Sequence, residues 1–195
     1  EMCIRDRPCA DPALIPSLLD ENGEFHSSRT FRERFKRGEE LIDFDEACIE
    51  IRAQHDHFVE IVGREPDYFE AHAVMSKNLN RAISAVAQEL GLKEQKASFD
   101  PTAVVHCGDT DLRMVMHSME PGYEPKDSIM QTVREMADGE TVVFVCHPGY
   151  LDRFILENSS LTTDRTKEVD ALIDPELRAW LEAQDDLHLI DYRDL

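Results

Sequence analysis

The sequence predicts an α/β fold built on a parallel sheet. Apolar residues recur every three or four positions in several long segments, which is typical of amphipathic helices. Short apolar runs of strand length separate those segments. Strands that alternate with helices favour a parallel sheet, whose ligands bind beyond the carboxyl ends of its strands. No internal repeat or linker divides the chain, so residues 8–195 are expected to form a single domain.

Helices dominate the expected structure of the first hundred residues. Residues 8–26 are rich in Pro, Asp and Asn and predict an irregular loop. A long helix is expected to begin after Asp43, a plausible N-cap, and to end at Gly63. Its apolar stripe consists of Leu41, Phe44, Cys48, Ile51, His55, Phe58 and Val62. The other expected elements are short helices in 30–42, a strand at 66–72 and a helix at 78–91.

Strands and helices alternate more regularly in the second half. Residues 142–145, Val-Val-Phe-Val, predict a buried strand that runs on to His147. A helix with Pro125 near its start precedes this strand, and Pro175 opens a later helix. The expected strands are 102–107, 112–118, 141–147 and 187–195, and the expected helices are 125–139, 150–158, 161–174 and 174–184.

The composition excludes several classes of partner. The 195 residues carry a formal charge of −20, whereas a nucleic acid or an anionic membrane requires a basic face. No apolar run approaches the roughly 20 residues that span a bilayer. The five cysteines form no Cys-x-x-Cys pair, which favours reduced thiols over disulfides or a zinc site. These features are typical of a cytoplasmic protein.

The first seven residues, EMCIRDR, resemble the translation of a transposase adapter end. We expect residues 1–7 to be an assembly scar and leave them out of the fold prediction. A genuine but unusual N-terminus is the alternative interpretation.

Two histidines occupy equivalent places in the pattern. His72 closes the strand 66–72, and His147 closes the strand 141–147, where Pro148 and Gly149 then turn the chain. A neutral imidazole binds metals, and it exchanges a proton near neutral pH. One such histidine alone is more simply a packed core residue. Two at corresponding strand ends favour a functional site.

Other residues near these histidines have a functional and a simpler interpretation. Glu70 lies on the same strand face as His72, which suits metal binding or an ordinary ion pair at the rim. Asp152 could orient His147, although an acid that starts the next helix is the simpler role. Cys146 is a poor nucleophile for His147 to activate, since adjacent strand residues point to opposite faces.

Several segments, taken in order, resemble the YdjC-like carbohydrate deacetylases. They are PSLLDENGEF near the start, Ala53, Gln54 and Phe58 on the long helix, GREPDYFEAH before and through His72, VCHPGYLD around His147, and LIDYRDL at the end. The resemblance covers nearly all of residues 8–195. It implies an incomplete variant (β/α) barrel and a hydrolase that removes acetyl groups from N-acetylated sugars.

The resemblance also assigns roles to residues. It implies that His72 is a ligand of a divalent metal, Mg²⁺ or Zn²⁺, and that His147 is the general acid. Glu70, Tyr150 and Asp152 are expected to bind substrate or to orient these groups. The family's Asp-Asp motif and first metal histidine would lie upstream of Pro8, so this chain is expected to be a partial domain without them and a poor or inactive enzyme. Glu70 stands where the family has Asp, and residues 73–76 differ from the family pattern.

The substrate expected from the resemblance is a small molecule or an oligosaccharide. Two other functions stay open: another metal-dependent amidohydrolase or esterase on the same fold, and a non-catalytic sugar-binding protein. A homodimer also stays open.

Overall fold

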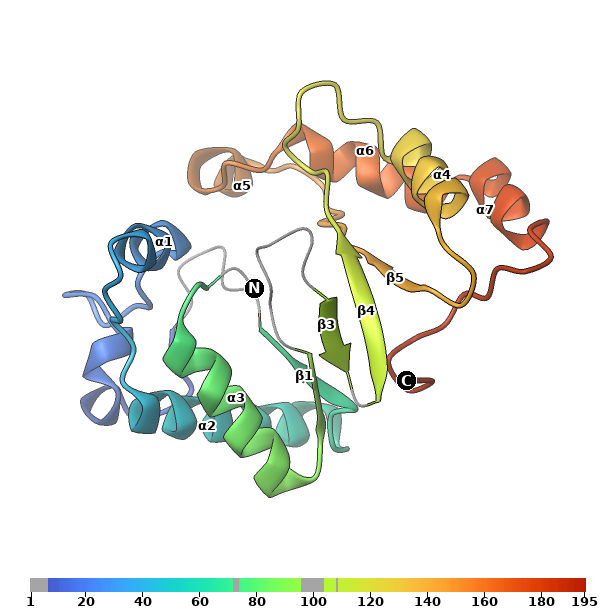
Figure 1. Ribbon diagram of the computed structural model, residues 1–195. Coiled ribbons are helices and arrows are strands. Elements are labelled where there is room, and N and C mark those ends of the chain that lie inside the picture. The colour runs from blue at the N-terminus through green and yellow to red at the C-terminus, as the bar shows by residue number, and fades with distance from the viewer. Residues whose placement is uncertain (1–6, 72–73, 96–103, 108) are drawn as a thin grey trace. The chain divides into compact units, whose positions relative to one another are not determined.

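Helices and short strands alternate in the computed structural model, which describes residues 7–71, 74–95, 104–107 and 109–195 (Figure 1). Two units make up the chain. The first comprises residues 1–97 with Leu195, and the second comprises residues 98–194. The prediction of a mixed α/β fold is confirmed.

The first unit is built around two helices that pack side by side, α2 (Phe44–Val62) and α3 (Lys77–Leu90) (Figure 1). Helix α3 also packs on a two-stranded parallel sheet of β1 (Tyr68–Glu70) and β2 (Lys93–Gln95). Helix α1 (Ser28–Lys36) precedes α2, and the expected loop 8–26 contains two 3₁₀ turns, η1 (Pro12–Leu14) and η2 (Pro16–Leu18).

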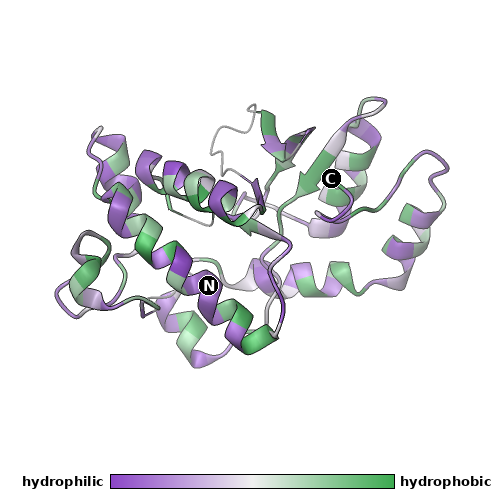
Figure 2. Ribbon diagram, turned by 90° about the horizontal axis from the view of Figure 1, so that it is seen from below, coloured by the Kyte–Doolittle hydropathy of each residue, from purple (hydrophilic) through white to green (hydrophobic). Residues whose placement is uncertain are grey.

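Local signals fix both ends of α2, as predicted. The carboxylate of Asp43 accepts hydrogen bonds from the backbone N–H groups of Asp45 and Glu46. Gly63 ends the helix with a φ of 75°, a conformation that glycine adopts without steric cost. Figure 2 shows apolar bands repeated between polar ones along the helices. The apolar side packs into a core formed by Ile15, Leu18, Leu19, Phe31, Ile42, Ala47, Cys48, Val74, Ala82 and Val86.

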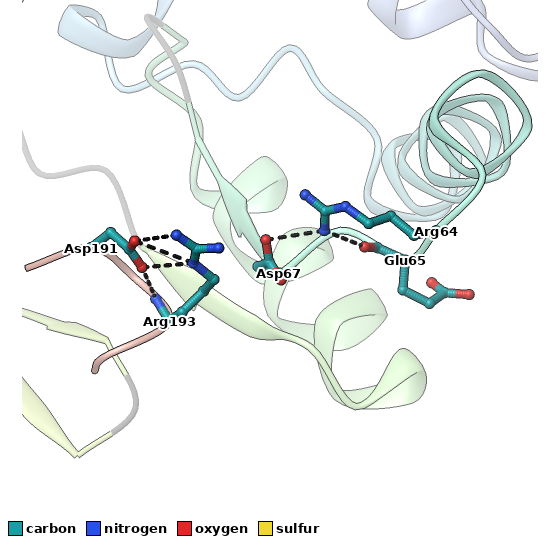
Figure 3. A network of polar contacts seen from close by, with 5 residues as sticks. All are labelled: Arg64, Glu65, Asp67, Asp191 and Arg193. Carbon is teal, nitrogen blue, oxygen red and sulfur yellow. Dashed lines mark hydrogen bonds and ion pairs between the residues drawn. The ribbon is translucent and has the colours of Figure 1, made fainter.

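His55, a member of the predicted apolar stripe of α2, is buried, and both of its ring nitrogens have polar partners. Nε2 lies 2.6 Å from Glu65, and Nδ1 lies 3.1 Å from Asp56. The hydrogen bond with Asp56 and then that with Glu65 raise the pKa of His55 above its ordinary value. In the loop between α2 and β1, Arg64 donates to the Asp67 carboxylate, a contact that joins two residues of this loop (Figure 3).

The second unit contains a three-stranded sheet in the order β3 (Val104–Cys107), β4 (Thr110–Val115) and β5 (Thr141–Phe144). Strands β4 and β5 are parallel, as predicted, whereas β3 and β4 are antiparallel. The prediction of an all-parallel sheet is therefore wrong at this pair. Cys107 pairs with Thr110, and a connection so short can join only antiparallel strands.

Three helices of the second unit pack on one another: α4 (Pro125–Glu135), α6 (Thr163–Leu172) and α7 (Pro175–Glu182). Lys126 on α4 reaches the Asp174 carboxylate that caps α7, at 2.6 Å. A shorter helix, α5 (Arg153–Asn158), lies between β5 and α6 in the chain. Among the described ranges, the strands do not close into a barrel, and no helix is long and apolar enough to cross a membrane.

The strand predicted for residues 187–195 is wrong. Asp191 binds the side chain and the backbone N–H of Arg193 (Figure 3). Asp194 N donates back to Asp191 O at 2.9 Å. These local bonds lower the pKa of Asp191 to about 2, mainly through the Arg193 guanidinium. The segment turns on itself because its charged residues satisfy each other.

Candidate functional site

His147 begins the His-Pro-Gly segment, residues 147–149, which is called the HPG segment below. Strand β5 ends at Phe144 rather than at His147, and its four residues are half-buried instead of fully buried as expected. The ladder continues for one more residue, since Val145 N donates to Val115 O at 2.7 Å. His147 itself is half-buried and lies just beyond the end of the strand. The HPG segment therefore follows a strand end, although the strand is shorter than predicted.

Helix α6 holds the main chain of the HPG segment at three points. His147 N donates to Glu168 Oε2 at 2.6 Å, and Arg165 Nη1 donates to His147 O at 3.4 Å. Gly149 N donates to Arg165 O at 3.3 Å. Both helix residues are buried, with Arg165 5% exposed and Glu168 0% exposed. The position of His147 is thus set by two charged side chains in the core of the second unit.

The His147 imidazole has a neighbour on another part of the chain. Ser118 Oγ lies 3.4 Å from Nδ1, a long hydrogen bond of the kind that catalytic groups often show without substrate. The same hydroxyl donates to Glu168 Oε1 at 2.6 Å. Tyr123 Oη donates to Glu168 Oε1 as well, at 3.0 Å. The buried Glu168 carboxylate therefore accepts hydrogen bonds from the Ser118 and Tyr123 hydroxyls and from the His147 backbone, and Ser118 in turn contacts the His147 ring.

Burial and the Glu168 charge change the acidity of two neighbouring groups. The pKa of the Cys146 thiol rises to about 11, first because burial disfavours the thiolate and then because Glu168 repels it. The pKa of Tyr123 is raised too, by burial and then by its hydrogen bond to Glu168. Both groups stay protonated at neutral pH. The raised pKa of Cys146 agrees with the expectation that it is a poor nucleophile.

The loop that carries Ser118 is bent at Met119, a non-glycine residue with a φ of 75°. Such a conformation costs roughly 1–2 kcal/mol in an L-residue, so other contacts must fix it. Met119 N donates to Asp164 Oδ2 at 2.9 Å, and Lys167 Nζ donates to Tyr123 O at 2.8 Å. Both partners lie on α6. The helix therefore anchors this loop as well as the HPG segment.

The other predicted site residues of the second unit face different surroundings. Asp152 caps α5, because its carboxylate accepts from Ile155 N at 2.8 Å, which is the simpler of its two expected roles. Tyr150 is 80% exposed. The described contact at His147 Nδ1 comes from Ser118 and not from Asp152.

The remaining predicted residues belong to the first unit. His72 lies outside the described residues. Glu70 ends β1, is exposed, and lines a cavity of about 280 Å³ together with Ala71 and mostly apolar side chains. His72 and His147 belong to different units of the chain, and a shared site stays a prediction.

The described residues do not by themselves form a metal site. No group of three His, Cys, Asp or Glu side chains able to hold a metal ion occurs within the described ranges. They therefore do not fit a complete site for the expected divalent metal.

Comparison with known proteins identifies the family. A sequence profile described as "YdjC-like protein" matches residues 2–183. The chain belongs to the YdjC-like family. The predicted resemblance is confirmed over most of the chain.

Relatives of this YdjC-like chain are distant in sequence. "Carbohydrate deacetylase 2" of Listeria innocua serovar 6a is 26% identical over 182 residues, which cover 92% of the chain and 70% of the relative. "Carbohydrate deacetylase" of Geobacillus stearothermophilus is 28% identical over 194 residues, covering 96% and 71%. "Chitooligosaccharide deacetylase" of Serratia marcescens is 27% identical over 177 residues, covering 85% and 66%.

A solved structure shares the fold. It comes from Enterococcus faecalis V583 and is described as a candidate cellobiose-phosphate cleavage protein. The TM-score is 0.77 at 21% identity, and the match covers all of the YdjC-like chain and 75% of that structure.

The sequence prediction for this YdjC-like chain missed Ser118, Tyr123, Arg165 and Glu168. A signal for the last two was present. Buried positions recur at Leu161, just before α6, and at Arg165, Glu168 and Ala171 on the helix, the spacing of a core-facing stripe. Two charged residues on such a stripe must find partners in the core, and this marks them for attention. Ser118 and Tyr123 lie in an irregular loop and carried no comparable signal.

Proposed function

We propose that this YdjC-like chain serves the removal of acetyl groups from N-acetylated sugars or oligosaccharides, with His147 as the general acid. The observation that carries the proposal is the placement of His147, a half-buried imidazole that a buried network orients, in a chain whose relatives are named carbohydrate deacetylases. The incomplete barrel of the family type is part of the same proposal.

The reaction needs a proton at the departing nitrogen. Water adds to the acetyl carbon, and the carbon–nitrogen bond of the tetrahedral intermediate then breaks, giving acetate and the sugar amine. An amine leaves poorly as an anion, so a donor must protonate it as the bond breaks. The His147 imidazolium can donate this proton from Nε2, because Nδ1 faces Ser118. A base takes the proton of the water, and we assign that role to no described residue.

The other predicted residues keep proposed roles. His72 is the proposed ligand of a divalent metal, Mg²⁺ or Zn²⁺. Glu70 and Tyr150 are proposed to contact substrate, because Glu70 borders the cavity of the first unit and the Tyr150 side chain is largely exposed. Asp152 is proposed to act indirectly: it caps α5 and so fixes the position of the start of that helix near the substrate.

An acetate-release assay on N-acetylated chito-oligosaccharides tests the function. It should use the 195-residue chain, before and after chelation. We expect His147→Ala to reduce turnover by about 10²- to 10⁴-fold, the usual contribution of a general acid. His106→Ala is the matched control, since His106 is an exposed histidine of the same unit paired with Asp111.

Metal content separates the roles of the two histidines. We expect His72→Ala to lower the bound metal and His147→Ala to leave it unchanged. Loss of metal in the His147 variant would mean that the roles are exchanged. Sugar binding without acetate release would favour a binding protein, and hydrolysis of other amides or esters alone would favour another amidohydrolase.

A further inference from the structure

Glu168 is a fully buried carboxylate whose described partners are all hydrogen-bond donors. Oε2 accepts from His147 N at 2.6 Å, while Oε1 accepts from Ser118 Oγ at 2.6 Å and from Tyr123 Oη at 3.0 Å. A buried carboxylate is costly unless such bonds satisfy it. Both carboxylate oxygens of Glu168 are therefore satisfied, and the direction of each of these hydrogen bonds is fixed.

The direction of these bonds determines the protonation pattern of His147. A hydroxyl has one hydrogen, and Ser118 gives it to Glu168, which as a carboxylate can only accept. The oxygen of Ser118 is left as an acceptor toward Nδ1 of His147. Nδ1 must then carry a hydrogen. In the neutral ring, Nε2 is the nitrogen without a hydrogen.

We propose that Glu168 is a positioning residue that, through Ser118, holds His147 in the Nδ1–H tautomer and keeps Nε2 as the nitrogen that exchanges a proton. The catalytic meaning of this role rests on the proposed deacetylase function. The tautomer itself does not depend on it.

Glu168 also fixes the backbone position from which the His147 side chain extends. Its other oxygen binds His147 N, and Arg165 on the preceding turn of α6 binds His147 O. One carboxylate thus orients both the backbone and the side chain of the same histidine. A residue that only stabilised the core would have no reason to set the tautomer, and this difference provides the test.

Glu168→Gln should reverse the chain of hydrogen bonds. The amide oxygen of the new residue must face His147 N, which can only donate, so its NH₂ group faces the two hydroxyls. Ser118 then accepts from the amide and turns its own hydrogen toward Nδ1 of His147. The variant is expected to hold the Nε2–H tautomer instead.

Tyr123→Phe is the matched control. Tyr123 and Ser118 donate to the same oxygen of Glu168, but the contact with the His147 ring comes from Ser118. Tyr123→Phe removes one donor to Glu168 Oε1, as Ser118→Ala does. It leaves in place the hydrogen bonds from Ser118 to Glu168 and between Ser118 and Nδ1 of His147. Ser118→Ala removes that route and should leave a mixture of both tautomers.

Nitrogen NMR of the full chain with labelled histidine measures the tautomer directly, at a pH above the imidazole titration. We expect Nδ1–H in the parent and in Tyr123→Phe, Nε2–H in Glu168→Gln, and a mixture in Ser118→Ala. Backbone amide spectra would show that each variant is folded. An Nε2–H parent, a folded Glu168→Gln with the parent tautomer, or a Tyr123→Phe that changes as Glu168→Gln does would overturn the proposal.

Kinetics provide a second readout that separates this proposal from the function. With a hydrolysed sugar, Ser118→Ala should lower kcat by about 10-fold or more at unchanged KM, as loss of an orienting partner typically does. Tyr123→Phe should lower kcat less than Ser118→Ala does, because the contact of Ser118 with Nδ1 of His147 remains. If the expected tautomers occur but no acetate is released, the deacetylase proposal fails and the positioning role stands. If acetate is released but Glu168→Gln keeps the parent tautomer, the positioning role fails alone.

Discussion

Glu50 holds the N-terminal segment onto α2, and replacing it tests how that segment is stabilised. Its side chain is 4% exposed, and Oε1 accepts from Cys9 N at 3.1 Å and from Gln54 Nε2 at 2.8 Å. Oε2 accepts from Ala10 N at 2.9 Å. Glu50→Ala removes all three bonds, and Glu50→Gln keeps one accepting oxygen in nearly the same volume.

The magnitude follows from the number of bonds. Each bond should contribute about 1 kcal/mol net, because the freed backbone groups lie near the surface and regain water. Glu50→Ala should therefore lower the free energy of unfolding by about 3 kcal/mol and Glu50→Gln by about half as much. For a chain of this length, about 3 kcal/mol corresponds to a fall in Tm of roughly 6–12 °C.

Thermal unfolding followed by circular dichroism, together with hydrogen exchange at Cys9 and Ala10, would measure both effects. Faster exchange should be confined to the N-terminal segment in Glu50→Gln. Gln54→Ala, which removes only the side-chain donor, is the control and should cost about 1 kcal/mol. A Glu50→Ala protein within about 0.5 kcal/mol of the parent would refute the reasoning, since that is the usual effect of a surface change.

Three further predictions concern titratable groups. The pKa of His55 is raised, first by Asp56 and then by Glu65, so its stabilising contribution is present below about pH 6.5 and is lost as the pH rises through the folded pKa. Urea unfolding should show the stability difference between the parent and His55→Gln shrinking from about pH 6 upward, and a constant difference would contradict this. Arg113, followed by the Ala137 backbone, lowers the pKa of Glu140, so the advantage over Glu140→Gln should persist above about pH 4.5 and disappear in more acidic solution. The raised pKa of Cys146 predicts slow alkylation by iodoacetamide at about pH 8 until the chain is unfolded, and labelling as rapid as that of the exposed Cys9 would contradict the raised pKa.

Helix boundaries were predictable where a single residue type decides them. Asp43 and Gly63 delimit α2 through a side-chain cap and a left-handed backbone, and both signals are local. Strand ends depend on partners far away in the chain. The paired register of β5 with β4 ends at Phe144, and one further hydrogen bond, from Val145 N to Val115 O, follows it; nothing in the sequence of β5 itself marks that point.

The errors have a common physical origin in contacts that alternation cannot reveal. Residues 187–195 alternate like a strand, but Asp191 and Arg193 bind one another and turn the chain. Strand β2 is only Lys93–Gln95, a polar triplet without any apolar pattern, and it was missed.

At the candidate site, the sequence pointed to His147 through its place after an apolar run. The groups that orient it were not predictable, because Ser118 and Glu168 lie 29 and 50 residues from their respective partners His147 and Ser118. Only the folded chain brings them together.

Three closely spaced residues of α6 bind the two segments that meet at His147. Asp164 and Lys167 bind the loop around Met119 and Tyr123, and Arg165 binds the HPG segment. The helix therefore anchors both Ser118 and His147. If α6 moves as a rigid body, the Ser118 hydroxyl and the His147 imidazole move with it, and the distance between them is unchanged. Conformational fluctuations elsewhere in this unit would then leave the orientation of the His147 ring unchanged. Only local unfolding of α6 itself would free the ring to reorient.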